Sequence, residues 1–313
     1  PNEPDKEHDY IADHIAATRQ AYGIDGVSIE DYPAVVNVSA GQLKADAQTL
    51  PSIRLMDPNL VSSTFEQLQQ VRGYYAFTDT LAVDRYVVEG KSTDLVLAAR
   101  ELLQSGIPDK NWNNLHTVYT HGYGLVSAYG NRRQPNGEPV WVTRDIPPNG
   151  PIEQEQSRIY FGQQSTTFAI VGRAEGQSPI ELDTPGGGSG GGETYNVYDG
   201  KGGVGMGNLL VRAMYAIRFS DVNILLSDRV SSASKILYDR TPQQRVQLVA
   251  PWLTPDKTTY PAIVDGRLVW IVDCYTTSSS FPNAQSVLLS DAVSDSQNRG
   301  ALRFDGEVNY IRN

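Results

Sequence analysis

A dense segment at residues 111–124 constrains this chain more than any other part of its sequence. These fourteen residues include two of the chain's four histidines, three asparagines, one tryptophan, two tyrosines and two glycines. The central run Thr117-Val118-Tyr119-Thr120 is rich in β-branched and aromatic side chains, which favour extended backbone. We therefore expect a strand over residues 115–120, set within a shaped site.

Helix signals occur on both sides of this segment. Ser-Thr-Asp at residues 92–94 resembles a helix cap, and Gly106 with Pro108 resembles a stop, which together predict a helix over residues 92–106. Apolar periodicity predicts further helices over residues 8–22, 64–72, 208–219 and 241–250.

The helix at residues 208–219 contains several large apolar side chains. Leu210, Ala213 or Met214, and Ile217 recur at helical spacing, and we expect this row to face the core.

The strand signals favour antiparallel hairpins. The clearest hairpin covers residues 260–272, because Asp265-Gly266 is a favoured type I′ turn pair. Residues 158–162 and 167–172 predict a second hairpin. Single strands are expected at residues 34–38, 85–88, 140–143 and 307–313. Helices mixed with hairpins in this way predict an α+β fold.

The proline-rich connection at residues 145–151 predicts a boundary between two subdomains. The first, residues 1–145, is expected to be helix-rich and to contain the dense segment. The second, residues 146–313, is expected to be hairpin-rich. Residues 186–192 consist only of glycine and serine, a composition typical of a flexible linker.

Composition excludes several classes of protein. The formal charge of −10 gives no basic surface for a nucleic acid backbone. The single cysteine, Cys274, lies in an apolar run and predicts a buried core side chain rather than an internal disulfide. No run approaches the roughly 18 apolar residues of a membrane span. The charged, proline-containing start at residues 1–7 is typical of a cut point, so we expect an excised soluble piece.

The dense segment closely resembles part of the uncharacterised protein family 0182. Four further motifs carry the same resemblance, at residues 69–86, 198–204, 234–240 and 260–277. Members of the family are large bacterial proteins with several membrane helices, a big extracytoplasmic domain and no established biochemical activity. The resemblance implies an extracytoplasmic domain at the cell membrane, joined to the membrane through segments outside this sequence.

Our preferred functional hypothesis is a non-enzymatic module of a multi-pass membrane protein. Such a module would engage an envelope ligand or partner, or would pack into its own oligomer. A binding module would present an exposed aromatic surface. The candidate ligand-binding residues are Trp112, Tyr123, Tyr129 and Trp141.

The alternative hypothesis is a hydrolase or transferase acting on envelope glycans or lipids. Carboxylates among aromatic side chains are what a glycan-processing cleft requires. The candidate catalytic residues are Asp79, Asp84, His116 and His121.

The sequence predicts neither a metal site nor a cofactor. On the expected strand, His116 and His121 would face opposite sides, because facing alternates with a period of two. The glycine-rich Lys201–Gly205 run is followed by Met-Gly-Asn, whereas a phosphate-binding loop needs Lys and then Ser or Thr.

Overall fold

The computed structural model describes residues 3–28, 41, 55–186, 192–278, 287–289 and 307–312. The chain divides into two compact units, Pro1–Gln48 and Thr49–Asn313, and each is described by itself. In the first unit, helix α1 (Glu3–Ala21) confirms the helix predicted over residues 8–22. The strand predicted at residues 34–38 and most of the Gly/Ser run lie outside the described residues. The subdomain boundary near residue 145 stays a prediction.

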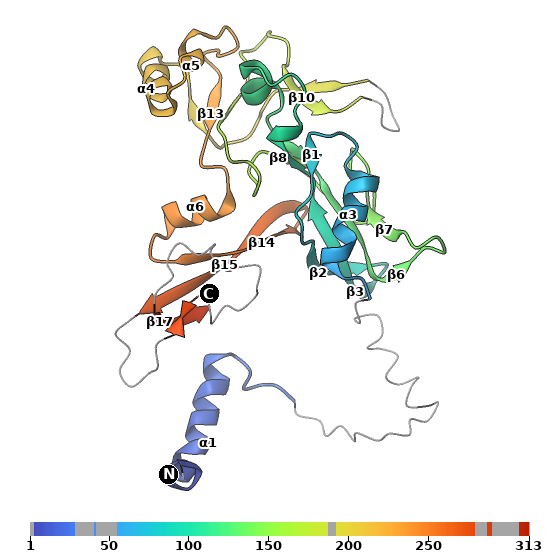
Figure 1. Ribbon diagram of the computed structural model, residues 1–313, viewed down its shortest axis with the longest axis vertical. Coiled ribbons are helices and arrows are strands. Elements are labelled where there is room, and N and C mark those ends of the chain that lie inside the picture. Colours follow the sequence, from blue (N-terminus) through green and yellow to red (C-terminus); the bar gives the residue numbers. More distant parts are fainter. Residues whose placement is uncertain are drawn as a thin grey trace. The chain divides into compact units, whose positions relative to one another are not determined.

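An antiparallel four-stranded sheet in the order β2-β3-β6-β7 is the first large element of the second unit (Figure 1). Its strands are β2 (Ala82–Val88), β3 (Lys91–Ala99), β6 (Leu125–Arg133) and β7 (Pro139–Thr143). Glu89 and Gly90 join β2 to β3 with φ of 53° and 75°, the positive values that a two-residue type I′ turn requires. Helix α3 (Pro58–Gln69) covers one face of this sheet, where Phe65 packs with Val96 and Val126.

The remaining strands form smaller antiparallel sheets. A second four-stranded sheet has the order β14-β15-β17-β16, a three-stranded sheet the order β12-β13-β9, and β1–β4, β5–β8 and β10–β11 form pairs. Their bounds are β1 (Tyr75–Ala76), β4 (Glu101–Leu102), β5 (Gly122–Tyr123), β8 (Arg158–Ile159), β9 (Ala169–Val171), β10 (Glu181–Thr184), β11 (Thr194–Asn196), β12 (Val204–Gly205), β13 (Lys235–Leu237), β14 (Thr254–Val264), β15 (Arg267–Ser278), β16 (Val287–Leu288) and β17 (Glu307–Arg312).

Several helical elements complete the second unit. These are η2 (Gln104–Gly106), the π-helical turn η3 (Asn114–Val118), α4 (Leu209–Phe219), α5 (Asn223–Leu226) and α6 (Pro242–Val249). Helices and antiparallel sheets together confirm the α+β fold class. The Asp265-Gly266 hairpin and the strands predicted at residues 85–88, 140–143 and 307–313 are also confirmed.

The helix predicted over residues 92–106 is wrong. Strand β3 occupies this region and pairs with β2 on one side and β6 on the other. Its residues 95–99 are all buried. A strand covered on both faces has no polar alternation, so its continuous apolar run also satisfies a helical period.

The strand predicted over residues 115–120 is also wrong, because η3 occupies residues 114–118. Asparagine side chains hold the backbone in this tight turn. The Oδ1 atom of Asn111 accepts the backbone N–H of Asn114 at 3.0 Å, and the Asn114 amide donates to the carbonyls of Pro108 and Asp109. Such local bonds compete with a strand ladder.

The hairpin predicted between residues 158–162 and 167–172 is not formed. Strand β8 pairs with β5, and β9 pairs with β13. Both predicted segments contain real strands, but their partners come from distant parts of the chain, which local periodicity cannot indicate.

The helices predicted from residues 208 and 241 begin there, because Asn208 caps α4 and Thr241 caps α6. Helix α3 begins earlier than predicted, after Asp57, whose Oδ1 accepts the N–H of Asn59 at 2.9 Å. The inward face predicted for α4 is wrong. Leu210, Met214 and Ile217 are exposed, and the opposite side of the helix packs on the core.

Two buried arginines join segments that are far apart in sequence. Arg100 is fully buried and donates to the carbonyls of Gln69, Tyr123 and Asp145 at 2.7, 2.9 and 3.2 Å. Arg240 is equally enclosed. It donates to the carbonyls of Thr120, Tyr160 and Thr167 at 2.6, 2.7 and 3.2 Å.

We expect Arg240→Met to destabilise the fold by at least about 3 kcal/mol, because it leaves three buried carbonyls without donors. Urea unfolding followed by circular dichroism measures this change. Arg133→Met is the control, since Arg133 is exposed at the end of β6. Equal stability of the two variants would contradict a structural role for Arg240.

Candidate functional site

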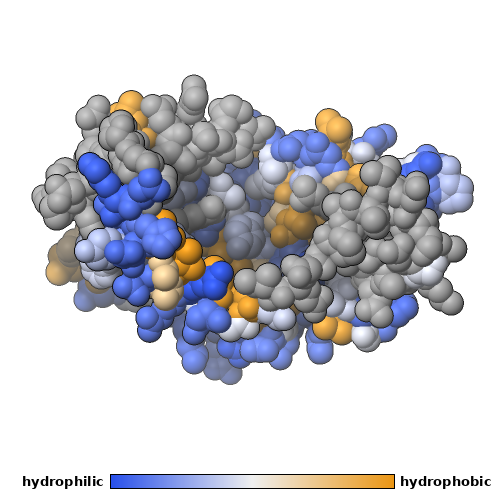
Figure 2. Space-filling view, turned by 90° about the horizontal axis from the view of Figure 1, so that it is seen from below, coloured by the Kyte–Doolittle hydropathy of each residue, from blue (hydrophilic) through white to orange (hydrophobic). Residues whose placement is uncertain are grey.

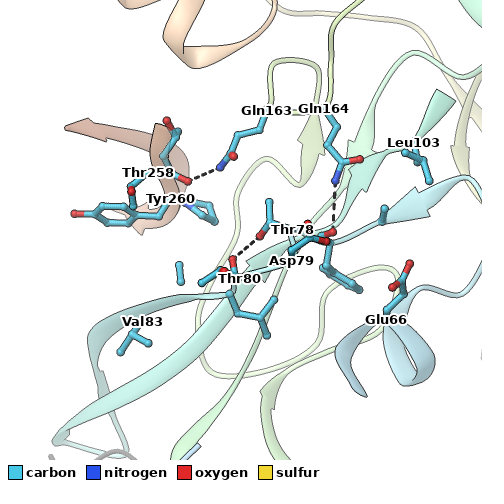
Figure 3. Close-up of a pocket in the computed structure, with 16 residues that line it drawn as sticks. Glu66, Thr78, Asp79, Thr80, Val83, Leu103, Gln163, Gln164, Thr258 and Tyr260 are labelled. Atoms are coloured by element: carbon cyan, nitrogen blue, oxygen red, sulfur yellow. Dashed lines mark hydrogen bonds between the residues drawn. The ribbon is translucent and has the colours of Figure 1, made fainter. Parts of the chain in front are cut away.

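A groove of about 730 Å³ lies beside the start of β2 (Figure 3). One wall is the segment from Ala76 to Val83, and the other is the stretch of β14 from Thr258 to Pro261. Glu66 of α3, Leu103 and the loop residues Gln163 and Gln164 complete its lining. The volume lies within the range of about 300–1,000 Å³ that is usual for ligand pockets.

Helix α3 holds the first wall in place. Ser62 Oγ donates to the Thr78 carbonyl at 2.8 Å, and the Leu81 N–H donates to the Pro58 carbonyl at 3.3 Å. Thr78 Oγ1 also donates to the Thr80 carbonyl at 2.8 Å. These bonds set the turn that leaves the side chain of Asp79 exposed in the groove.

The two glutamines connect the walls. Gln163 Nε2 donates to the Thr259 carbonyl on β14, and Gln164 Nε2 donates to the Phe77 carbonyl at 3.5 Å on the opposite wall. Their loop is held from behind by Glu101, whose Oε2 accepts the Gln164 N–H at 2.9 Å. A Cβ at Gly162 would lie 2.1 Å from this oxygen, so the close approach requires glycine.

Glu101 is a buried carboxylate behind the groove. Burial raises its pKa to about 7, and the backbone N–H groups of Gln164 and Gln163 and the charge of Arg240 oppose this rise. Its Oε1 atom is buried and has no hydrogen-bond partner among the described residues. The carboxyl therefore changes charge near neutral pH.

The lining of the groove is half polar and half apolar, and it carries no positive charge. Its 16 residues include four threonines, two glutamines and two acids, Glu66 and Asp79, and none is Lys, Arg or His. Val83 and Tyr260 supply partly exposed apolar surface, whereas the ring of Phe77 is buried in the core. This lining suits a neutral or cationic ligand that is rich in hydroxyl or amide groups.

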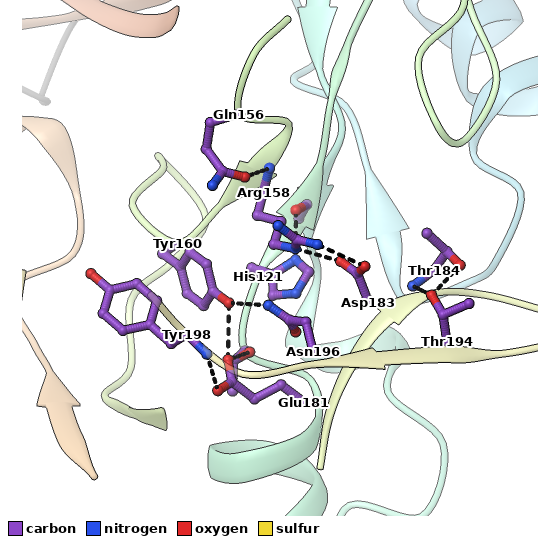
Figure 4. A network of polar contacts seen from close by, with 12 residues as sticks. His121, Gln156, Arg158, Tyr160, Glu181, Asp183, Thr184, Thr194, Asn196 and Tyr198 are labelled. Atoms are coloured by element: carbon purple, nitrogen blue, oxygen red, sulfur yellow. Dashed lines mark hydrogen bonds and ion pairs between the residues drawn. The ribbon is translucent and has the colours of Figure 1, made fainter. Parts of the chain in front are cut away.

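A second polar cluster is buried beside the dense segment (Figure 4). Glu181 accepts hydrogen bonds from Thr120 Oγ1 at 3.1 Å and Tyr160 OH at 2.9 Å, and from the backbone of Gly172 and Tyr198. Beside it, Arg158 and Asp183 form a bidentate ion pair with N–O distances of 2.6 and 2.9 Å. These contacts tie β8, β9 and β10 together.

His121 lies inside this second cluster and is almost fully buried. Its Nδ1 contacts the Gly122 carbonyl at 3.0 Å. Nε2 of His121 and Oδ1 of Asn196 are both buried, and neither forms a hydrogen bond within the described part of the chain. The nearby Asn196 side chain acts to raise the pKa of His121. Burial dominates and lowers the His121 pKa to about 4, so the ring is neutral at pH 7.

The candidate catalytic residues are not gathered in one place. Asp79 lines the groove, whereas Asp84, His116 and His121 do not. Asp84 is half-buried on β2 and accepts the Arg85 N–H at 2.8 Å. His116 stacks on Phe168 with ring centroids 4.0 Å apart, and its Nδ1 contacts the Phe168 carbonyl at 2.9 Å.

The candidate ligand-binding aromatics belong to the interior. Tyr123 and Tyr129 are buried. Trp141 packs on Phe65 at 4.7 Å, and the Trp112 Nε1–H donates to Asp221 at 2.6 Å. All four side chains are buried or packed against the core, so they do not form an exposed aromatic surface.

Sequence reasoning missed most of the groove. Glu66, Gln163, Gln164 and Tyr260 come from a helix, a loop and a strand, and only the tertiary fold brings them to Asp79. One local signal was present. The run Phe-Gly-Gln-Gln-Ser at residues 161–165 places two amides after a glycine, as an exposed polar loop would.

The fold and its groove define an α+β domain with buried polar clusters, and comparison with known proteins assigns the family. The sequence matches the uncharacterised protein family UPF0182 over residues 1–313, and the chain belongs to this family. No solved structure matches the chain.

Relatives from several bacteria cover the whole chain. A UPF0182 protein of Kineococcus radiotolerans is 49% identical over 322 residues, and 31% of its own length is matched. Those of Tropheryma whipplei and Leifsonia xyli are 48% and 46% identical, with 33% and 32% of their lengths matched. The chain therefore spans about a third of the length of these relatives.

Within the described residues, no helix combines the length and the apolar character needed to cross a membrane.

We expect His121 to make stability depend on pH. Its pKa is lower in the folded chain than in the unfolded chain, so the unfolded state gains protons first, and about 3 kcal/mol of stability is lost as pH falls from 6.5 to 4. In His121→Asn this loss should largely disappear from urea unfolding curves. His8→Asn, at an exposed position on α1, should unfold like the parent chain at each pH.

Glu101 should make the stability of the fold change with pH in the opposite direction. Its pKa is raised in the folded chain, so its contribution is most favourable below pH 4.5, and about 3 kcal/mol is lost as pH rises to 7. Glu101→Gln should narrow the difference in unfolding free energy between pH 5 and pH 8. Glu175→Gln, at an exposed position, should not, and an unchanged difference in Glu101→Gln would contradict the shifted pKa.

Proposed function

We propose that this chain is a non-enzymatic binding module at the cell envelope, within a longer membrane protein, and that its ligand binds in the groove. The envelope location rests on what the family resemblance implies. The ligand site rests on one observation, the concave lining of mixed polarity between the Ala76–Val83 segment and β14. Hydroxyls, amides, carboxylates and the ring of Tyr260 belong to that lining.

The lining favours an envelope saccharide as the ligand. Glutamine amides and carboxylates form directional hydrogen bonds with sugar hydroxyls, and the partly exposed ring of Tyr260 suits the apolar side of a sugar ring. The acids Glu66 and Asp79 also favour an amino group, because no basic residue in the lining offsets them.

A hydrolase acting on envelope glycans is the second candidate. Two carboxylates flanking a sugar are the usual requirement for glycoside hydrolysis, and Glu66 and Asp79 share the groove. The predicted histidines His116 and His121 have no place in such a mechanism, since both contact backbone carbonyls away from the groove.

Calorimetric titration with oligomers of N-acetylglucosamine and of glucosamine tests the proposal. We expect binding that weakens about tenfold, or about 1.4 kcal/mol, in Asp79→Asn and in Glu66→Gln, because each loses a charged acceptor. The larger loss should occur for the glucosamine oligomer, which carries ammonium groups.

Glu175→Gln serves as the matched control, since it removes an exposed acid that does not line the groove. Equal affinity of all three variants for both oligomers, or no binding by the parent chain, would contradict the groove as a saccharide site. Shortened oligomers after long incubation, lost in Asp79→Asn, would favour the hydrolase instead.

A further inference from the structure

Glu101 holds a loop of the groove without lining the groove itself. It lies on β4, is 1% exposed and does not belong to the 16 lining residues. Its Oε2 accepts the backbone N–H of Gln164 at 2.9 Å, and the backbone N–H of Gln163 also favours the ionised carboxyl. We call residues 161–164 the groove loop. A ligand in the groove would therefore interact with Glu101 only indirectly, through this loop.

The first half of the groove loop is held by groups that do not titrate near neutral pH. The Trp270 Nε1–H donates to the Phe161 carbonyl at 2.8 Å, and the Gly162 N–H donates to the backbone carbonyl of Arg240 at 3.1 Å. An indole and a backbone amide keep the same charge between pH 6 and pH 8. We therefore expect this half to keep its position across that range.

The second half of the groove loop joins the two walls. The side-chain amide of Gln163 donates to the Thr259 carbonyl on β14, and that of Gln164 donates to the Phe77 carbonyl at 3.5 Å on the other wall. The backbone N–H groups of the same two glutamines face the Glu101 carboxyl. The half that joins the walls is therefore the half that depends on a titratable group.

The ionised and the neutral carboxyl of Glu101 differ in how they hold the loop. The ionised form accepts charge-assisted hydrogen bonds, which are roughly twice as strong as neutral ones. In the neutral form the proton has to lie on Oε1, because Oε2 already faces an N–H donor. Oε1 is buried and has no hydrogen-bond partner in the described part of the chain. Protonation thus weakens the bond to the loop and adds a buried O–H without an acceptor.

Arg240 supplies the charge that acts on this carboxyl among the described residues. The strands packed around it contribute uncharged residues, Ala76 from β1 and Gly122 from β5, and the adjacent Arg100 donates to backbone carbonyls elsewhere. Hydrophilic residues lie on parts of the face seen in Figure 2, where solvent screens their charges. The buried carboxyl lacks such screening, so a change of its charge acts strongly on the loop.

We propose that Glu101 is a positioning residue of the groove, and that its ionisation strengthens saccharide binding by fixing the groove loop. This inference rests on the proposed function. The ionised carboxyl holds Gln163 and Gln164 where their amides join the walls, so the groove is preorganised for its ligand. Burial raises the pKa of Glu101 to about 7, so the change occurs near neutral pH. As pH rises through this range, affinity should increase while the stability of the fold decreases.

Hydrogen exchange tests the loop without any ligand. In the parent chain we expect the Gln164 amide to be about fivefold better protected at pH 8 than at pH 6, after correction for its intrinsic exchange rate. The Gly162 amide is the internal control, since its acceptor is a backbone carbonyl. In Glu101→Gln the protection of the Gln164 amide should be the same at both pH values.

Calorimetric titration with the uncharged N-acetylglucosamine oligomer tests the coupling to the ligand. The parent chain should bind about fivefold more tightly at pH 8 than at pH 6. Because coupling is reciprocal, binding at pH 7 should release a fraction of a proton, which titrations in buffers of different ionisation heat detect. Glu101→Gln should show neither effect. Asp79→Asn removes an acid of the lining, so it should bind more weakly and keep the same ratio between the two pH values.

Three results would overturn the proposal. They are equal protection of the Gln164 amide at both pH values in the parent chain, equal affinity of the parent chain at both, and a pH-dependent affinity that persists in Glu101→Gln. An oligomer that binds at neither pH contradicts the saccharide site, and hydrogen exchange then decides alone whether Glu101 controls the loop. If Glu101→Gln does not fold, the protection and the proton release of the parent chain still decide the question.

Discussion

The second unit depends on two guanidinium groups that are buried among backbone carbonyls. Burying a cation is costly unless its donors are satisfied. Arg100 and Arg240 meet this condition with three carbonyls each, drawn from segments between 23 and 120 residues away. Burial lowers both pKa values to about 10, so both groups stay charged at neutral pH. The planar five-donor guanidinium can serve several carbonyls at once, which an ammonium group cannot do in the same plane.

These anchors explain why the dense segment is a structural junction rather than an open site. Arg240 holds the carbonyl of Thr120, and Arg100 holds that of Tyr123, so both ends of the His121 turn are attached to the interior. Glu181 takes the Thr120 hydroxyl as well. A histidine enclosed in this way is neutral, and its role is to fill and order the cluster. The groove, by contrast, has exposed side chains in its lining, among them Glu66, Asp79 and Thr80.

Two adjacent buried charged residues, Arg100 and Glu101, connect the interior to the groove. Glu101 follows Arg100 directly, and its carboxylate holds the loop whose glutamines join the two groove walls. Two consecutive residues between β3 and the end of β4 therefore position a buried cation and a loop of the proposed ligand site. Buried charged groups therefore help to set the geometry of the groove, whose own lining contains no cation.

The sequence by itself determined the elements whose signals are local. Asn208 and Thr241 mark two helix starts, and Asp265-Gly266 marks one hairpin, because caps and turns depend on neighbouring residues. Motifs also identified the family. The tertiary structure alone decided that residues 91–99 form a central strand, which side of α4 faces the core, and that Asp79 shares a groove with Gln163 and Tyr260. Each of these depends on partners far along the chain, and hydrophobic periodicity does not specify which partner covers a face.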